Sequence, residues 1–185
     1  MTSVQLFGFD GSTYLKTVQI ACARLAIPYE TLSLEFGKPS HLALHPFAKM
    51  PAMRHGDVSL YETAAILSYL NDLSEDASLV PEEPVQRARM WQGVSAAIDY
   101  GYPALVRSTF TDDTTTVDLK PVEQCLAAFA NLLGDNSWLA GDTVSFADVI
   151  IGPMVAHFVH AAPSGQAVLD RHEKLADWNR RMAAD

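Results

Sequence analysis

The sequence predicts an α/β domain followed by an all-helical domain. Strand and helix patterns alternate over the first third of the chain, and only helical patterns follow. Between them, residues 72–84 are rich in Asp, Ser and Glu and contain Pro81 and Pro84, which is typical of a linker. We therefore expect a first domain over residues 1–74, a linker over residues 75–84 and a helical domain over residues 85–185.

The first domain opens with a strand, a helix and a second strand. Val4 to Phe9 is a short apolar run that ends at Asp10-Gly11, and apolar residues recur at helical spacing from Leu15 onward. Tyr29 to Leu34 then has the pattern of a strand. A strand–helix–strand unit of this length normally forms a parallel pair with a right-handed crossover.

A short helix and a hairpin complete this domain. The helix is expected around Ser40 to Leu44, and the strands Ala52 to Arg54 and Val58 to Leu60 flank His55-Gly56-Asp57. Glycine in that turn readily supplies the positive φ that a tight hairpin needs. Glu62 to Leu73 is predicted as a helix. The order βαβ, α, ββα matches a thioredoxin-like arrangement.

The second domain contains four helical patterns. They cover Val85 to about Arg107, Lys120 to Leu133, Phe146 to about Val159, and Glu173 to Met182. Ser145 precedes the third pattern, and Asp148 stands at its third helical position. These two side chains can accept hydrogen bonds from the unpaired amides at the helix start, which stabilises the helix by about 1 kcal/mol.

Composition excludes two classes of partner. The net charge of −9 and the pI near 5.0 would repel nucleic acid, because the Lys and Arg residues are scattered and do not form basic clusters. No apolar run approaches the roughly 20 residues of a membrane span, and the amino terminus has no signal-like block. Cys22 and Cys125 lie far apart outside any CxxC motif, as in proteins of a reducing compartment, so we expect a cytoplasmic protein.

Met50-Pro51 is the most informative dipeptide in the chain. A proline where a strand should begin cannot donate to a central ladder, so the bond before it is a candidate for the cis isomer. The Met50 backbone would then be available to pair with another group. Met50-Pro51 is followed by a short strand, a turn and a helix that begins at Glu62-Thr63.

This pattern resembles the glutathione-binding half of the soluble glutathione transferases. A second segment, Trp138 to Val149 (WLAGDTVSFADV), is similar to the start of a buried helix in the second domain of the same family, and bacterial and phi-like members are nearest. The resemblance implies an enzyme of detoxification that conjugates glutathione, its cosubstrate, to a small hydrophobic electrophile or reduces the electrophile with it. It also implies a homodimer.

The family activates the glutathione thiol with a hydroxyl group near the first helix. An unperturbed thiol has a pKa near ~8.5 and is only a few per cent ionised at neutral pH, so a hydrogen-bond donor and a helix amino terminus both favour the thiolate. Ser12 lies six residues before Val18, where serine-type members place this catalytic residue. Thr13, where proline is frequent, and Tyr14 stay open as donors, and Ser12 could also serve only as a helix cap.

The resemblance also implies how glutathione is held. The Met50 backbone ahead of Pro51 would pair with the cysteinyl backbone, Glu62 would bind the ammonium group, and Thr63 with the helix amides would bind the α-carboxylate. For the glycyl carboxylate, Phe36 and Gly37 replace a His-Lys pair common in phi-like members. Lys38 or Lys49 could take over this role, since lysine is a mobile point charge.

Two alternatives remain at this point. The changed glycyl subsite and the short second domain favour a noncatalytic glutathione-transferase-like module for binding or assembly. Another glutathione-dependent enzyme on the same fold, an isomerase or a peroxidase, is the other alternative. No metal site is expected, because His157 and His160 lie three residues apart without a third ligand and are better explained as a packed or interface pair.

Overall fold

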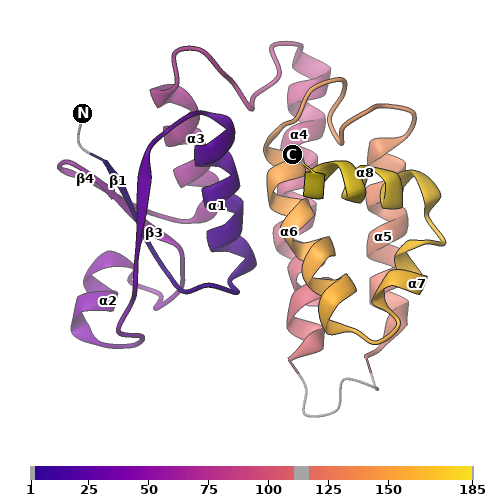
Figure 1. The fold of residues 1–185 in the computed structure, drawn as a ribbon, viewed down its shortest axis with the longest axis horizontal. Coiled ribbons are helices and arrows are strands. Elements are labelled where there is room, and N and C mark those ends of the chain that lie inside the picture. The colour runs from indigo at the N-terminus through magenta and orange to yellow at the C-terminus, as the bar shows by residue number, and fades with distance from the viewer. Residues whose placement is uncertain (1–2, 111–116, 185) are drawn as a thin grey trace. The chain divides into compact units, whose positions relative to one another are not determined.

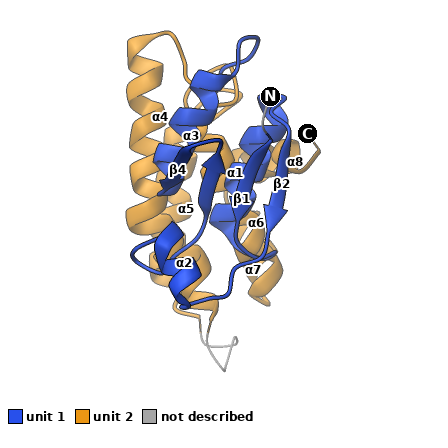
Figure 2. Cartoon of the chain, turned by 90° about the vertical axis from the view of Figure 1, so that its left-hand side faces the viewer, with its two compact units in different colours: residues 1–79 blue, residues 80–185 orange. Residues whose placement is uncertain are grey.

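The chain consists of two compact units, residues 1–79 and residues 80–185 (Figure 2). The computed structural model describes residues 3–110 and 117–184. The division between the units falls inside residues 75–84, and the limits of the linker stay a prediction. Within the described residues no helix is long and apolar enough to cross a membrane.

Unit 1 contains a four-stranded mixed sheet (Figure 1). The strand order is β2-β1-β3-β4, where β1 is Val4–Phe7, β2 is Tyr29–Leu32, β3 is Ala52–His55 and β4 is Val58–Tyr61. β1 and β2 are parallel, and the other two pairs are antiparallel. The expected parallel unit and the expected hairpin are therefore both present.

Helices α1 (Thr13–Arg24) and α3 (Thr63–Leu73) pack against each other and cover one face of the sheet (Figure 1). The short helix α2 (Pro39–Leu44) packs against β4 instead. Val18 of α1 and Ile66 and Leu70 of α3 are fully buried, as are the strand residues Leu6 and Met53. Hydrophobic periodicity thus positions the two helices whose amino termini enter the argument below.

Unit 2 is all-helical and is built around α6 (Phe146–Ala161). Every residue from Phe146 to Val155 is buried, because α4 (Pro84–Ala96), α7 (Gly165–Leu169) and α8 (Glu173–Ala184) pack around this helix. The remaining α-helix is α5 (Leu119–Leu133).

The start of α6 is fixed by one buried carboxylate. Asp148 Oδ2 accepts hydrogen bonds from the Ser145 amide and hydroxyl, both at 2.9 Å. Its Oδ1 accepts from the Leu139 amide at 2.9 Å and from Trp178 Nε1 at 2.8 Å. Burial raises the pKa of Asp148, although all four hydrogen bonds oppose that shift. The predicted cap is confirmed, and it also ties α6 to α8.

Two features of unit 2 differ from the expectation. The segment predicted as one helix over residues 85–107 continues after α4 as a π-helix, η1 (Ala97–Val106), and ends in a 3₁₀ turn, η2 (Arg107–Thr109). Pro103 lies within η1, and a proline removes an α-helical hydrogen bond and crowds the preceding turn. Helix α7 was not predicted, because five residues are too few to show a helical period.

Candidate active site

The ends of all four strands in unit 1 meet in one row. Phe7, the last residue of β1, pairs with Leu32, the last residue of β2, and with Ala52, the first residue of β3. Ala52 also pairs with Tyr61, the last residue of β4. Neighbouring strands lie about 4.8 Å apart, so the segments that join the sheet at this row begin close together. These segments contain every site residue predicted from the sequence: Ser12, Lys38, Lys49, Met50, Pro51, Glu62 and Thr63.

Ser12 is the N-cap of α1. Its Oγ accepts a hydrogen bond from the Leu15 amide at 3.3 Å, and its carbonyl accepts one from the Lys16 amide at 2.9 Å. Accepting a hydrogen bond does not use the hydroxyl hydrogen. The half-buried Ser12 side chain can therefore cap α1 and donate to a bound thiolate at the same time, beside the positive end of the helix dipole.

The two neighbouring hydroxyl groups lie in different environments. Thr13 is only 6% exposed, and its Oγ1 is buried without a hydrogen-bond partner among the described residues. Tyr14 is half-buried and already interacts with another group. Of the three hydroxyl groups, that of Thr13 is thus closed off from a ligand in solution.

The Met50-Pro51 peptide bond is cis, as expected. Pro51 is buried and directly precedes β3, whereas Met50 is half-buried. Among residues 3–110 and 117–184, no other group forms a hydrogen bond with the Met50 amide or carbonyl. The Met50 backbone therefore presents a donor and an acceptor at the row of strand ends.

Glu62 and Thr63 form the entry to α3. Glu62 is the N-cap with φ 70° and ψ 119°, a left-handed backbone that residues other than glycine seldom adopt and that is concentrated at functional sites. Within the part of the chain that the structure describes, its exposed carboxylate caps no amide of α3. Thr63 is 7% exposed. Since the first amides of a helix lack partners inside it, this entry offers N–H donors beside a carboxylate.

Lys38 and Lys49 are exposed side chains at the two ends of the α2 segment. A buried histidine that the sequence analysis missed, His41, connects these ends. Its Nδ1 accepts from the Gly37 amide at 3.1 Å, so Nε2 carries the proton and donates to the Lys49 carbonyl at 2.8 Å. His41 thus holds the backbone next to both lysines in a defined arrangement.

Comparison with known proteins identifies the family. The N-terminal domain family of glutathione S-transferases matches residues 6–78, and the C-terminal domain family of glutathione S-transferases matches residues 84–181. The chain belongs to the glutathione S-transferase family. It is accordingly a glutathione transferase with glutathione as its cosubstrate, and the predicted fold of a thioredoxin-like domain followed by a helical domain is confirmed.

Individual relatives of this transferase agree with that assignment. A probable glutathione S-transferase of Oryza sativa subsp. japonica is 26% identical over 100% of this chain and 93% of that protein. The maleylacetoacetate isomerase of Pseudomonas aeruginosa is 29% identical over 82% of this chain and 80% of that protein.

Solved structures share the fold of the transferase. A glutathione transferase from Populus trichocarpa has a TM-score of 0.87 at 20% identity and covers 98% of this chain and 94% of its own. A family member from Pseudomonas fluorescens, solved with two glutathione bound, has a TM-score of 0.85 at 22% identity and covers 100% of this chain and 89% of its own.

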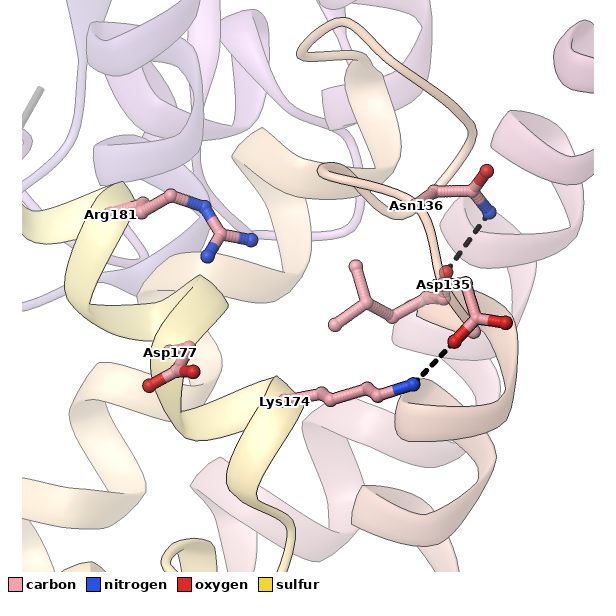
Figure 3. Close-up of a pocket in the computed structure, with 7 residues that line it drawn as sticks. Asp135, Asn136, Lys174, Asp177 and Arg181 are labelled. Carbon is pink, nitrogen blue, oxygen red and sulfur yellow. Dashed lines mark hydrogen bonds and ion pairs between the residues drawn. The ribbon is translucent and has the colours of Figure 1, made fainter.

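Unit 2 of the transferase has a hollow of about 250 Å³ between the end of α5 and α8 (Figure 3). Lys174 pairs with Asp135 at its edge, and Arg181 donates to the Ser137 carbonyl at 2.7 Å. Two cations and two carboxylates line the hollow, so their charges compensate. Its lining contains none of the predicted site residues: Leu133, Gly134, Asp135, Asn136, Lys174, Asp177 and Arg181.

The cysteines of the transferase are buried free thiols. Burial raises the pKa of Cys22 and of Cys125 to about 12, so both stay protonated near neutral pH and neither is a nucleophile. His157 packs with its Nε2 2.9 Å from Thr109 Oγ1, whereas His160 is exposed, so the two histidines do not form a packed pair within unit 2. Cys22, Cys125 and His157 therefore belong to the packing of the two units.

Proposed function

We propose that this transferase binds glutathione along the row of strand ends and transfers its thiolate to a small hydrophobic electrophile, or uses it to reduce one. One observation supports the proposal: the register of the sheet aligns the strand ends in one row, and the segments that begin there contain a hydroxyl group, an unpaired backbone edge, a carboxylate and helix amides. These groups match the thiol, the peptide backbone, the ammonium and the α-carboxylate of glutathione.

Ser12 is the proposed donor to the thiolate. A charged hydrogen bond and the amino terminus of α1 both favour the ionised sulfur, which is the reactive form. The enclosed Oγ1 of Thr13 supports Ser12 as the donor in preference to Thr13. The sulfur then bonds to the electrophilic carbon, and the leaving group departs with the bonding electron pair.

Three neighbouring groups are proposed to hold the γ-glutamyl-cysteinyl part. The Met50 backbone next to Pro51 would pair with the cysteinyl backbone in the manner of an added strand. The Glu62 carboxylate would bind the ammonium group, while Thr63 and the first amides of α3 would bind the α-carboxylate. The geometry of the α3 entry supports this role, since the Glu62 carboxylate caps no described amide of its own helix.

For the glycyl carboxylate we propose Lys38 or Lys49. Both lysines are exposed on a chain with a net charge of −9, so they are local positive charges near the row. The His41 hydrogen bonds fix the backbone on either side of α2, which lowers the entropy lost when either lysine orders on a ligand.

Removal of the Glu62 charge gives the sharpest test. Glu62→Gln should weaken glutathione binding about tenfold or more, because a charge-assisted contact worth about 1.5 kcal/mol already corresponds to that factor. Thr63→Val should weaken binding less, since backbone amides still bind the carboxylate. Glu75→Gln, an exposed charge of unit 1 outside the row, is the matched control and should bind as the wild type does. Calorimetric titration with glutathione, together with thermal melting of each variant, measures these effects.

The same titration addresses the noncatalytic alternative. A wild-type protein that binds no glutathione at millimolar concentration, or a Glu62→Gln variant that binds as well as the wild type, would contradict the site. Binding without turnover of a generic aryl halide or a hydroperoxide would favour a noncatalytic binding module.

A glutathione-dependent isomerase is the second candidate function. The 29% identity to a maleylacetoacetate isomerase is the observation that favours it. An isomerase uses the same thiolate, which adds to a carbon–carbon double bond and leaves again after rotation. Turnover of maleylacetoacetate, measured beside turnover of the aryl halide, distinguishes the two candidates.

We further propose a homodimer in the cytoplasm. The family, the 49% hydrophobic composition and exposed aromatic side chains such as Phe47 and Tyr100 support the dimer. Two buried free thiols support a reducing compartment. Sedimentation at micromolar concentration should give the mass of two chains, and a monomer at that concentration would contradict the dimer.

A further inference from the structure

His45 is a buried titratable side chain beside the proposed glutathione site. It is the C-cap of α2, and it is 2% exposed. Its Nδ1 has neither solvent contact nor a hydrogen-bond partner among the described residues. Unsatisfied buried polar atoms are rare and costly, so their retention calls for an explanation in function or structure.

The ring of His45 packs against the end of β4. Its centroid lies 4.9 Å from that of Tyr61 and 6.3 Å from that of Phe47, and the Phe47 and Tyr61 centroids are 6.3 Å apart. Tyr61 immediately precedes Glu62, where the backbone turns left-handed. Packing of His45 and Phe47 against Tyr61 therefore fixes the residue that directly precedes Glu62.

Charges around His45 connect its protonation to Glu62. Burial is the main cause that lowers the pKa of His45 below the ordinary histidine value of 6.5. The Glu62 carboxylate favours the imidazolium, whereas His41 and Lys49 oppose it. Tyr61 of β4 and Phe47 face the ring with their aromatic rings.

We propose that His45 is a positioning residue for glutathione recognition: its neutral ring supports the Glu62 segment, and protonation of His45 opposes glutathione binding. The proposal rests on the proposed role of Glu62 toward the ammonium group. A bound ammonium compensates the carboxylate charge that stabilises the imidazolium. The proton on His45 and the ammonium group of glutathione therefore compete for the same carboxylate.

Linkage gives the direction of the effect. Because protonation and binding oppose each other, glutathione affinity falls as the pH drops through the titration of His45, and bound glutathione lowers the pKa of His45 by the reciprocal amount. The ammonium and the carboxylates of glutathione keep their charges between about pH 5 and about pH 7.5. The thiol is proposed to ionise in the site, so the ligand for this measurement is S-methylglutathione, which has no ionisable thiol. A change in its affinity over that range therefore reports on groups of the protein.

Two variants separate packing from titration. His45→Phe keeps a ring against Tyr61 and Phe47 but removes the titration, and His45→Asn removes both the ring and the titration. His55→Gln, a half-buried histidine of the β-hairpin in unit 1, is the control. Calorimetry with S-methylglutathione at about pH 5 and about pH 7.5, with thermal melting at each pH, measures affinity and folding.

Wild-type protein and the His55→Gln control should bind S-methylglutathione about fivefold more weakly at the lower pH, as expected for an ordinary coupling between sites. His45→Phe should bind with nearly the same affinity at both pH values and match the wild type near pH 7.5. His45→Asn should also lose the pH dependence but bind more weakly at both values. A wild-type affinity independent of pH, or a His45→Phe variant with the wild-type dependence, would overturn the proposal.

A measurement on the unmodified protein keeps the test independent of variant folding. The His45 titration, followed by nuclear magnetic resonance of the imidazole, should shift to lower pH when glutathione is bound, and an unchanged midpoint would overturn the proposal. If the wild-type protein binds no glutathione near pH 7.5, the proposed function itself fails. Binding near pH 7.5 without coupling to His45 refutes only the role of His45.

Discussion

At the residue scale, one hydroxyl group can perform two tasks at the start of α1. Ser12 Oγ accepts a hydrogen bond from the Leu15 amide, which leaves its hydrogen available for a further acceptor. Local capping and thiolate stabilisation are usually weighed as alternatives for a serine at a helix start. Here the geometry makes them compatible, so a single substitution should alter both stability and catalysis.

Ser12→Ala should lower kcat about tenfold or more, since a hydrogen bond to a charged group contributes about 1.5–3 kcal/mol. Glutathione affinity should change less, because the remote anchors are untouched. Stability should fall by about 1 kcal/mol through loss of the cap. Steady-state kinetics with an aryl halide, calorimetry and urea unfolding measure the three effects.

Ser12→Thr keeps the hydroxyl group and should recover most of kcat. Unchanged turnover in Ser12→Ala, with loss in Thr13→Val or Tyr14→Phe, would reassign the donor. Equal losses of affinity and turnover would instead point to a damaged site.

At the element scale, helix packing in unit 2 depends on a close approach between α4 and α6. A Cβ added at Gly93 would lie 2.7 Å from Ala147 Cβ and 3.0 Å from Leu132 Cδ2. Neither backbone can move apart freely, because both helices are packed within the unit. The close contact between α4 and α6 therefore requires glycine at position 93, although glycine is a poor helix former.

Gly93→Ala should destabilise unit 2 by about 1 kcal/mol, because overpacking costs about 1–3 kcal/mol and exceeds the gain of about 1 kcal/mol in helix propensity. In an Ala147→Gly background the same substitution should be neutral or stabilising, since the clashing Cβ is absent. Urea unfolding of the four proteins of this double-mutant cycle measures the coupling.

Ser95→Ala is the control on the exposed side of α4 and should change stability little in either background. If Gly93→Ala has the same effect with and without the Ala147 methyl group, the close approach is not what requires glycine.

Much of the fold follows from local sequence patterns, but particular contacts do not. The strands and helices of unit 1 agree with the alternating pattern to within a few residues, and Ser145 with Asp148 marks the start of α6. The hydrogen bond from Trp178 to Asp148 joins residues that are 30 positions apart in the sequence, and no spacing rule predicts it. The π-helical region after α4 escaped prediction because its apolar spacing still resembles an α-helix.

The candidate site shows the same limit. Met50-Pro51 and Glu62-Thr63 were predicted because each is a local motif, and the resemblance to a family supplied their proposed roles. His41 and His45 were missed, since their contacts with Lys49 and Tyr61 depend on how the α2 segment folds back. The common row of strand ends depends on sheet register, which a single sequence leaves open.

At the scale of the whole molecule, stability should depend on pH through a buried histidine in unit 1 and a half-buried histidine in unit 2. Burial lowers the pKa of His45 in unit 1 and of His157 in unit 2. An unfolded chain binds protons at these histidines below about pH 6.5, whereas the folded chain holds them neutral until a lower pH. The unfolded state therefore binds more protons in this window, and stability falls as the pH drops from about 6.5 toward the folded pKa values.

His157→Gln tests this dependence in unit 2. The glutamine amide can still donate toward Thr109 but does not titrate, so the variant should lose less stability than the wild type between about pH 7.5 and about pH 5.5. One proton limits the difference to about 1.4 kcal/mol per pH unit. His160→Gln, an exposed neighbour on α6, should behave as the wild type does. Urea unfolding at both pH values measures the change, and equal losses of stability in His157→Gln and wild type would show that the His157 imidazole does not govern acid sensitivity.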